Sequence, residues 1–244
     1  MAALFIAAIT AVDTTINPEL NAKLSTSTSQ LDRLALLPSN KDWLFDFSTQ
    51  KPTYNFSPGG VTNMNAATFP AAKGHGLTLA VLNLGPCSML PPHFHPRGAN
   101  FVVAISGNTT TYMYEENGAH AITEILTPMK ATIFPQGSLH MMVNTGCENA
   151  QLISALSSDD AGTSNFGQIF TNGFPSDLIN AAWGSNVVNG ESQAKMNPPG
   201  TGANWGTKEC LSRCKVNTTS ASAGPAGYST AAGGGGKGGN GTRS

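Results

Sequence analysis

The chain has 244 residues, with 13 lysines and arginines against 14 aspartates and glutamates, so its net charge is close to zero. No long run of like charge occurs, which removes the electrostatic basis for nucleic-acid binding by a basic face. Hydrophobic residues make up 40% and charged residues 11% of the chain, which also has 27 glycines and 15 prolines. This composition is typical of a turn-rich globular protein and excludes a highly charged disordered chain.

The first eleven residues form a short apolar segment that ends in small residues. This pattern is typical of a secretory signal, although a basic start is missing; the alternative is a buried N-terminal strand or helix. Four Asn-X-Ser/Thr sequons, at Asn55, Asn108, Asn217 and Asn240, and an even cysteine count also favour export. We therefore expect a secreted protein, extracellular or in a cell wall, that is glycosylated at Asn108 and Asn217. No other apolar run approaches the ~20 residues of a membrane span.

The next segments predict short helices followed by many short strands. Leucines spaced among polar residues indicate one or two helices within residues 17–37, and an aromatic alternation indicates a strand at 43–47. From residue 61 to 157, alternating segments separated by turn signals are typical of a sandwich or barrel. Asn117-Gly118 is a strong hairpin signal. The expected strands are 77–84, 101–105, 109–114, 120–126, 132–134, 140–143 and 151–155.

After residue 158 the pattern changes to helices and then to low complexity. Residues 176–184 predict a helix with Ser176 as its N-terminal cap and a glycine at its end, and residues 209–214 predict one further helical turn. Residues 221–244 are mostly glycine, serine, alanine and threonine, so we expect a disordered tail.

These patterns divide the chain into five segments. The expected divisions are a signal-like segment at 1–11, an N-terminal extension with short helices at 12–42, a β barrel at 43–158, a C-terminal helical extension at 159–220 and the tail at 221–244.

Five histidines provide the clearest chemical signal. His93 and His95 are two residues apart, so an extended strand would point both imidazoles to one face, where they could bind one metal ion. The alternative is a pair of solvated loop histidines. His140 follows a Pro-X-Gly turn on a later strand and can supply a third ligand. His75 and His120 have no partner at ligand spacing, so we expect them at the surface.

The two histidine segments resemble the paired motifs of the cupin superfamily. The first motif is His-X-His followed by a glutamate, and the second is Pro-X-Gly-X-X-His-X-X-X-Asn. Pro-His-Phe-His-Pro-Arg is similar to germins, and the wider frame from about Leu31 to Cys214 resembles fungal spherulin-type germin-like proteins. The resemblance implies an all-β fold, a single cupin jelly-roll β barrel with short terminal helices. It also implies a divalent metal ion, usually manganese, held by three histidines and one glutamate, with His93, His95 and His140 as the histidine ligands.

One position departs from that pattern. Asn100 stands five residues after His95, where the family has glutamate. An asparagine can offer a carbonyl oxygen but no charge, so affinity for manganese should fall, and zinc or copper become alternatives. We expect Asn100 to point towards the ion, as a weak oxygen donor or as a partner of a metal-bound water. The alternative is that it caps the turn after Pro96-Arg97-Gly98 and faces away.

Two classes of function follow from the resemblance, and the sequence leaves open whether the chain is an enzyme. One is a manganese-dependent oxidoreductase of the oxalate oxidase or superoxide dismutase type, acting on a small anionic molecule. The other is a non-catalytic spherulin-like protein of a spore or cyst wall, or a metal-storage protein. A homo-oligomer is expected in either case. Arg97 could attract an anion, but pairing with a nearby carboxylate is favoured.

The cysteines predict a disulfide pattern. If His93 and His140 face one ion, their strands are neighbours, and Cys87 and Cys147 lie six and seven residues away in the same direction. Both displacements are about 20 Å at ~3.3 Å per residue, so Cys87 and Cys147 should pair. Cys210 and Cys214 would then pair locally. The alternative is four free thiols in a reducing compartment.

Overall fold

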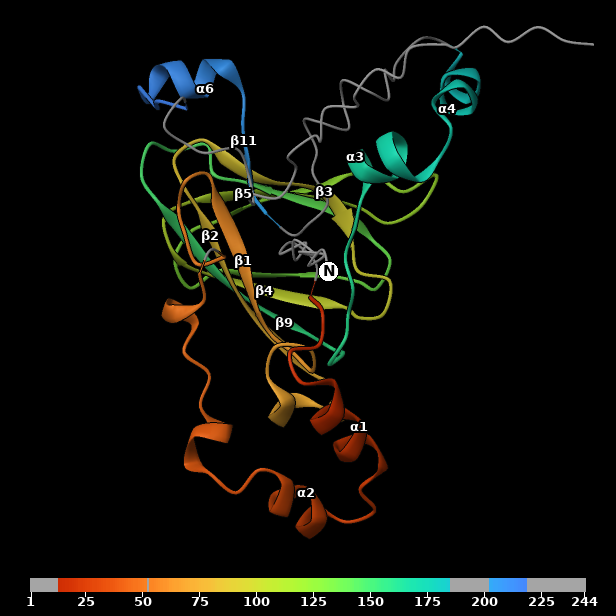
Figure 1. Cartoon of the computed structure of the whole chain (residues 1–244). Coiled ribbons are helices and arrows are strands. Elements are labelled where there is room, and N and C mark those ends of the chain that lie inside the picture. The colour runs from red at the N-terminus through yellow and green to blue at the C-terminus, as the bar shows by residue number, and fades with distance from the viewer. Residues whose placement is uncertain (1–12, 52, 185–201, 219–244) are drawn as a thin grey trace, which may run out of the picture.

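The structure is a computed structural model that describes residues 13–51, 53–184 and 202–218, in which two antiparallel sheets pack face to face (Figure 1). The first sheet has the strand order β1 (Gly59–Met64), β2 (Thr78–Leu84), β9 (Ala150–Leu156), β4 (Asn100–Ser106) and β7 (Ala131–Phe134). The second has the order β10 (Ser164–Asn165), β3 (Ser88–Phe94), β8 (Leu139–Val143), β5 (Thr109–Tyr114) and β6 (Ile122–Leu126), and β11 (Asn204–Trp205) also pairs with β3. The predicted all-β fold is therefore confirmed.

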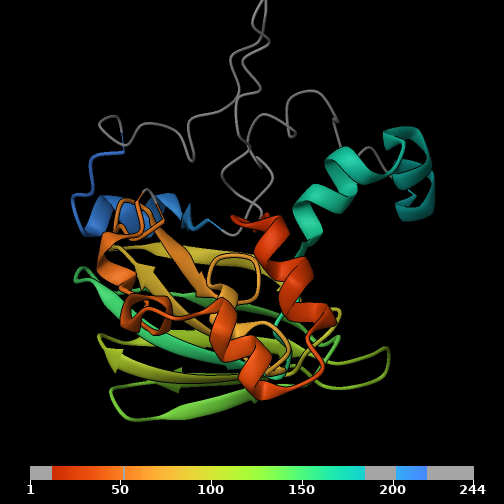
Figure 2. The same ribbon diagram turned by 60° about the horizontal axis from the view of Figure 1, so that its bottom comes forward.

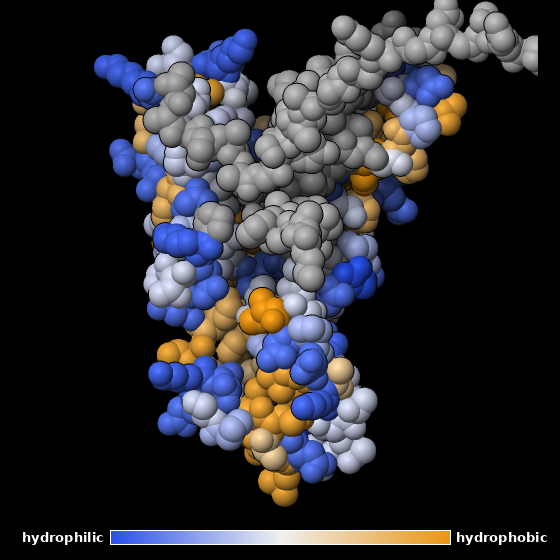
Figure 3. Space-filling model, viewed as in Figure 1, coloured by the Kyte–Doolittle hydropathy of each residue, from blue (hydrophilic) through white to orange (hydrophobic). Residues whose placement is uncertain are grey.

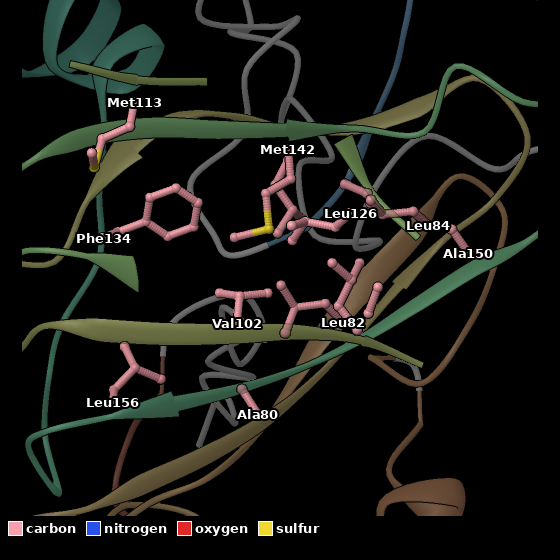
Figure 4. Close-up of a cluster of buried hydrophobic side chains, with 14 of the residues drawn as sticks. Ala80, Leu82, Leu84, Val102, Met113, Leu126, Phe134, Met142, Ala150 and Leu156 are labelled. Carbon is pink, nitrogen blue, oxygen red and sulfur yellow. The ribbon is translucent and has the colours of Figure 1, made fainter. Parts of the chain in front are cut away.

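The space between the sheets is filled by alternate side chains of the strands, as a half-buried sheet requires. Phe134, Val102 and Met142 are at most 1% exposed and lie between the two layers (Figure 4). Each buried side chain of this size contributes roughly 1.5–3 kcal/mol of hydrophobic free energy. The core therefore holds the two sheets at a fixed separation, and the inward side chains of β3, β4 and β8 share that interior.

Every strand expected between residues 77 and 155 is present to within two residues at either end. The Asn117-Gly118 signal marks the β5–β6 hairpin, in which Met113 is opposite Ile122, and Gly118 takes a φ of +96°. β1 and β3 had no separate prediction. β1 begins with two glycines and β3 contains two prolines, residue types that are depleted in strands.

The prediction of a strand at residues 43–47 is wrong. The structure has two 3-10 turns here instead, η1 (Asn40–Trp43) and η2 (Phe47–Thr49). A capping box between Ser39 and Asp42 closes the first turn, and the carboxylate of Asp46 accepts the backbone N–H of Ser48 at 3.0 Å in the second. Local side-chain hydrogen bonds to the backbone therefore stabilise turns where the aromatic alternation predicted a strand.

The α-helices lie at the two ends of the chain, as expected, and one 3-10 turn, η3 (Pro70–Ala72), lies between β1 and β2. α1 (Pro18–Thr26) and α2 (Gln30–Leu36) are capped by Asn17 and Ser29 and lie at one end of the sheets (Figures 1 and 2). Leu24 is 1% exposed and packs in a small separate cluster. The remaining helical segments are α3 (Phe166–Gln168), η4 (Ile169–Gly173), α4 (Ser176–Trp183) and α6 (Lys208–Arg213). Figure 3 shows that apolar side chains remain on the surface around α1 and α2.

Two details of the terminal segments qualify the predictions. α4 ends at Trp183 and is followed by the expected glycine, Gly184, which caps it in the left-handed conformation. Ser176 is its first residue and Pro175 is at the N-cap position, so the predicted serine cap is wrong. The predicted signal segment at 1–11 and the predicted tail at 221–244 lie outside the described residues, as does Asn240. Within the described part of the chain, no helix has the length and apolarity needed to cross a bilayer.

The predicted cysteine pairing is also wrong. The structure links Cys87 to Cys210 and Cys147 to Cys214, with Cα separations of 5.7 and 5.0 Å. The segments that carry Cys87 and Cys147 are neighbours, as expected, because the N–H of Cys87 donates to the carbonyl of Gly146 at 3.1 Å. The C-terminal segment reaches the same place because β11 adds to the edge of β3, opposite Ser88 and Met89. α6 then lies over this end of the sheet, and each of its cysteines bonds to a different loop.

This pairing predicts that α6 is fastened to the sheet by two separate bonds. Peptide mapping without reduction should recover Cys87–Cys210 and Cys147–Cys214 peptides. The double variant Cys147→Ser, Cys214→Ser should lower the free energy of unfolding by about 2–4 kcal/mol in urea denaturation. Ser212→Ala, in the same helix but outside both bonds, should leave stability unchanged. A Cys87–Cys147 peptide would contradict the structure.

Candidate metal centre

Three histidines from two neighbouring strands meet inside the sandwich. His93 on β3 lies directly opposite His140 on β8, and His95 follows just after the end of β3. The ring centroids of His93 and His140 are 4.3 Å apart, and that of His95 is 5.3 and 5.2 Å from the other two. One ligand nitrogen from each ring lies within 4.8 Å of the others. The structure thus brings together the three histidines that the motif selected.

The turn before β8 shows why the sequence positions His140 so accurately. Gly137 takes a φ of +83°, which the Pro-X-Gly motif allows because glycine has no Cβ. Its N–H donates to the carbonyl of His95 at 3.1 Å, which ties this turn to the end of β3. Phe134 stacks on the imidazole of His140 with ring planes 4° apart and centroids 4.1 Å apart, which fixes that ring.

All three imidazoles are held by the backbone through Nδ1. The partners are the carbonyls of Pro91 for His93, at 2.7 Å, Gly162 for His95, at 2.7 Å, and Ser138 for His140, at 2.9 Å. A carbonyl can only accept, so each Nδ1 carries the proton and each Nε2 keeps its lone pair. Nε2 of His140 is buried and has no hydrogen-bond partner among the residues that the structure describes. Backbone hydrogen bonds on the far nitrogen are the usual support of histidine metal ligands.

Burial keeps these imidazoles neutral. Loss of hydration is the main reason that the pKa of His93 is lowered to about 4 and that of His140 to about 2, with the neighbouring histidines adding to both shifts. Loss of hydration also lowers the pKa of His95. A neutral imidazole is the form that binds a metal ion, so the donors are ready at neutral pH without losing protons.

Asn100 lies inside the same space. It is 2% exposed, its Oδ1 accepts from the Ser154 hydroxyl at 2.8 Å, and its Nδ2 is 3.4 Å from Nε2 of His95. It does not face away from the interior, so the turn-capping alternative is wrong. A hydroxyl can donate or accept, so Ser154 can support Asn100 with either its oxygen or its nitrogen towards the histidines. The site therefore has a neutral amide where a carboxylate was expected from the resemblance.

His93, His95 and Asn100 border a cavity of about 340 Å³ between the sheets. His75 and His120 are exposed at the surface, as expected. Arg97 pairs with Asp160 at 2.8 Å, which is the carboxylate partner that was favoured for it. The positive charge of Arg97 at the cavity is therefore balanced by the negative charge of Asp160.

Several residues of the site had no prediction. The carbonyl of Gly162 and the hydroxyl of Ser154 support His95 and Asn100, and Asp13 lies on the cavity wall. A backbone carbonyl and a small hydroxyl leave no signal in a sequence, because any residue type supplies the first and many strands contain the second. Asp13 lies only two residues after the signal-like segment, where nothing in the pattern distinguishes it from a polar linker.

The fold and the site together define a β-sandwich protein with an internal centre of three neutral imidazoles, suited to a divalent transition-metal ion. Imidazole nitrogens suit zinc, copper, iron and nickel, and an unpartnered buried Nε2 is a donor that the protein itself does not satisfy. The residues present therefore fit a metal ion.

Comparison with known proteins gives the family. The Cupin family model matches residues 45–189. The chain is 33% identical to spherulin-1B of Physarum polycephalum over 85% of this chain and 83% of that protein. It is 30% identical to germin-like protein subfamily 3 member 1 of Arabidopsis thaliana over 57% of this chain and 67% of that protein. The chain therefore belongs to the cupin family, among its spherulin and germin-like members.

Solved structures agree on the fold. An oxalate oxidase structure matches with a TM-score of 0.55 and 18% identity over 62% of this chain and 77% of that chain. Oxalate decarboxylase from Bacillus subtilis matches with a TM-score of 0.57 and 17% identity over 69% of this chain and 46% of that chain. At these identities the likeness shows the cupin architecture and nothing about activity.

The burial of the imidazoles predicts that the metal-free protein loses stability as the pH falls below about 6.5. Unfolded histidines have a pKa near 6.5, whereas the folded pKa values are about 4 for His93 and about 2 for His140. The unfolded chain then binds protons that the folded chain does not. The free energy of unfolding should fall by roughly 1.4 kcal/mol per pH unit for each such histidine between about pH 6 and 4.5.

Urea denaturation of the metal-free protein at several pH values measures this slope. His93→Gln should reduce it by the share of one histidine, whereas His120→Gln, at an exposed position, should not change it. A stability that is constant over this interval would show that the imidazoles are not held neutral by burial.

The neutral amide predicts a second outcome, the effect of restoring a carboxylate. Asn100→Glu should tighten Mn²⁺ binding by roughly 10–100-fold, comparable to other changes in the groups around a metal, because a carboxylate oxygen suits a hard cation. Isothermal titration with Mn²⁺ gives the affinities. Asn100→Gln, which has the length of glutamate without its charge, should not tighten binding. Equal affinities of wild type and Asn100→Glu would mean that this position is not part of the site.

Proposed function

We propose that this chain is an exported cupin that holds one divalent transition-metal ion through Nε2 of His93, His95 and His140 and binds a small anion in the adjoining cavity. The observation that carries the proposal is the convergence of three neutral imidazoles whose Nδ1 atoms are all occupied by backbone carbonyls. Lone pairs on three Nε2 atoms repel one another, and a shared cation is the partner that satisfies all of them.

The identity of the ion depends on the group at position 100. Manganese, which the resemblance to germins implies, is the first candidate, but it is the weakest binder among the first-row divalent ions at nitrogen sites. Asn100 supplies no charge to offset this, so zinc and copper are the alternatives. The supporting hydrogen bonds from the backbone orient the imidazoles in the same way for each of these ions.

The catalytic form of the proposal is a manganese-dependent oxidoreductase of the oxalate oxidase or superoxide dismutase type. A bound manganese ion would supply one-electron redox chemistry and an electrophile for an anion. The chain supplies the rest: the imidazoles fix the ion, the Asn100–Ser154 pair lines one side, and the cavity of about 340 Å³ has room for a small substrate. The structural likeness to an oxalate oxidase extends to the fold alone.

A specific observation favours a second candidate, a spherulin-like structural or metal-storage protein without turnover. The three histidines and Asn100 include no carboxylate, so they do not offset the charge of a divalent ion. The spherulins also match more of this chain than the germin-like proteins do. In a storage or wall protein the ion would stabilise the sandwich, and the same imidazoles would serve without redox chemistry.

Export is part of the proposal. The two disulfides and the germin-like and spherulin relatives are consistent with an extracellular protein. Asn108 and Asn217 are both exposed, Asn108 in the turn between β4 and β5. Glycans at these two positions and assembly into a homo-oligomer therefore belong to the proposed mature form.

Metal analysis tests the proposal. Protein purified from its native host should contain about one divalent ion per chain by mass spectrometry. His93→Ala and His140→Ala should each lose it, and the surface variants His75→Ala and His120→Ala should retain it. Manganese together with oxalate oxidation or superoxide dismutation supports the enzyme, and zinc or copper without turnover supports the second candidate. Retention of the ion by His93→Ala and His140→Ala would overturn the proposed site.

A further inference from the structure

The cavity next to the three histidines carries a charge that comes from outside the sheets. Asp13, at the start of the described chain and before α1, lines this cavity together with His93, His95 and Asn100. No sequence motif marks this aspartate. The N-terminal segment thus supplies a carboxylate to a cavity whose described lining strands contain no carboxylate.

Asp13 is held in place by two amides. Its Oδ2 accepts from Nδ2 of Asn63 at 2.7 Å and from Nδ2 of Asn65 at 2.6 Å, at the end of β1. Asn65 is 6% exposed and is itself fixed, because its Oδ1 accepts the backbone N–H of Ala67 at 2.9 Å. Asp13 is exposed as a residue, but these two hydrogen bonds give its carboxylate a defined position.

The N-terminal segment is tied to the same turn a few residues later. The N–H of Ile16 donates to the carbonyl of Ala67 at 2.9 Å, and Nδ2 of Asn21 donates to the carbonyl of Ala66 at 2.6 Å. These bonds fix the segment that follows Asp13, so the position of Asp13 does not depend on the two amides alone.

The charges around the cavity can be counted. Besides the histidines, the ionisable side chains among the described lining residues are Asp13, Arg97 and Asp160. Arg97 and Asp160 form an ion pair at 2.8 Å and cancel. The imidazoles and Asn100 are neutral, so the described lining residues contribute a single net negative charge, that of Asp13. A divalent ion at the histidines would leave the cavity with a net charge of about +1.

We propose that Asp13 sets the charge selectivity of this cavity by weakening the binding of a small dianion more than that of a small monoanion. This inference rests on the proposed metal site. The repulsion between this carboxylate and a bound anion grows with the charge of the anion, so it opposes a dianion about twice as strongly as a monoanion. Removing the charge of Asp13 should therefore help a dianion about twice as much, in free energy, as it helps a monoanion.

Binding measurements on the zinc-loaded protein test the proposal, because zinc is not redox-active and substrate turnover cannot interfere. Isothermal titration at pH 7.5 gives the Kd of glycolate, a monoanion, and of oxalate, a dianion of similar size. Loss of hydration raises the pKa of Asp13, with the hydrogen bonds from Asn63 and Asn65 opposing the shift and Asp160 adding to it, so the measurement is made on the alkaline side of neutrality.

Asp13→Asn has the shape of aspartate and can still accept from Asn63 and Asn65. It should tighten glycolate roughly tenfold and oxalate roughly 100-fold, so that the affinity ratio shifts about tenfold towards the dianion. The shift should shrink as salt is added. Glu116→Gln, at the exposed tip of the β5–β6 hairpin, makes the same change in net charge and should leave the ratio unchanged.

The outcomes separate this proposal from the metal site. An unchanged ratio in Asp13→Asn with zinc still bound, or an equal shift in Glu116→Gln, would overturn the role of Asp13 and leave the metal site standing. A wild-type protein that binds no zinc or other divalent ion would overturn the proposed function, and the charge selectivity with it.

Discussion

The pairing of β3 with β8 is the constraint on which the rest of the structure depends. It places His93 directly opposite His140 and, through the turn at Gly137, holds His95 beside them. The same strand pair leads at its other end to Cys87 and Cys147. A shift of one residue between these strands would turn one histidine out of the interior and separate the loops that the disulfides join. The core between the sheets, centred on Phe134 and Met142, makes such a shift costly.

The second edge of β3 explains how the C-terminal part of the chain becomes part of the site. β10 pairs opposite His93 and Phe94, and β11 pairs opposite Ser88 and Met89. The segment before β10 supplies the carbonyl of Gly162 to His95, and the segment after β11 carries the two cysteines of α6. A strand whose edges are both occupied cannot pair with another molecule. The terminal extensions thus protect this edge while they support the metal ligands.

The electrostatics of the interior follow from the absence of a carboxylate on β4. The three imidazoles are neutral because they are buried, and Asn100 adds hydrogen-bonding groups without charge. The negative charge of the cavity comes from the N-terminal segment, where the amides of Asn63 and Asn65 hold Asp13. The two proposals therefore assign metal affinity to the strands and anion selectivity to a segment packed against them.

The sequence alone determined the features that depend on local spacing. Alternation predicted the strands, Asn117-Gly118 the hairpin, and the His-X-His and Pro-X-Gly motifs brought together His93, His95 and His140, because a period of two puts both strand histidines on one face. Only the tertiary structure decided the features that depend on distant segments. These include the disulfide partners, since β11 brings Cys210 to Cys87, and the arrival of Asp13 at the cavity. They also include the 3-10 turns at residues 40–49, which local caps stabilise against a strand pattern. Spacing along the chain fixes which residues share a face of a strand. Which distant residues join them, such as Cys210 at Cys87 or Asp13 at the cavity, depends on the packing of segments that are far apart in sequence.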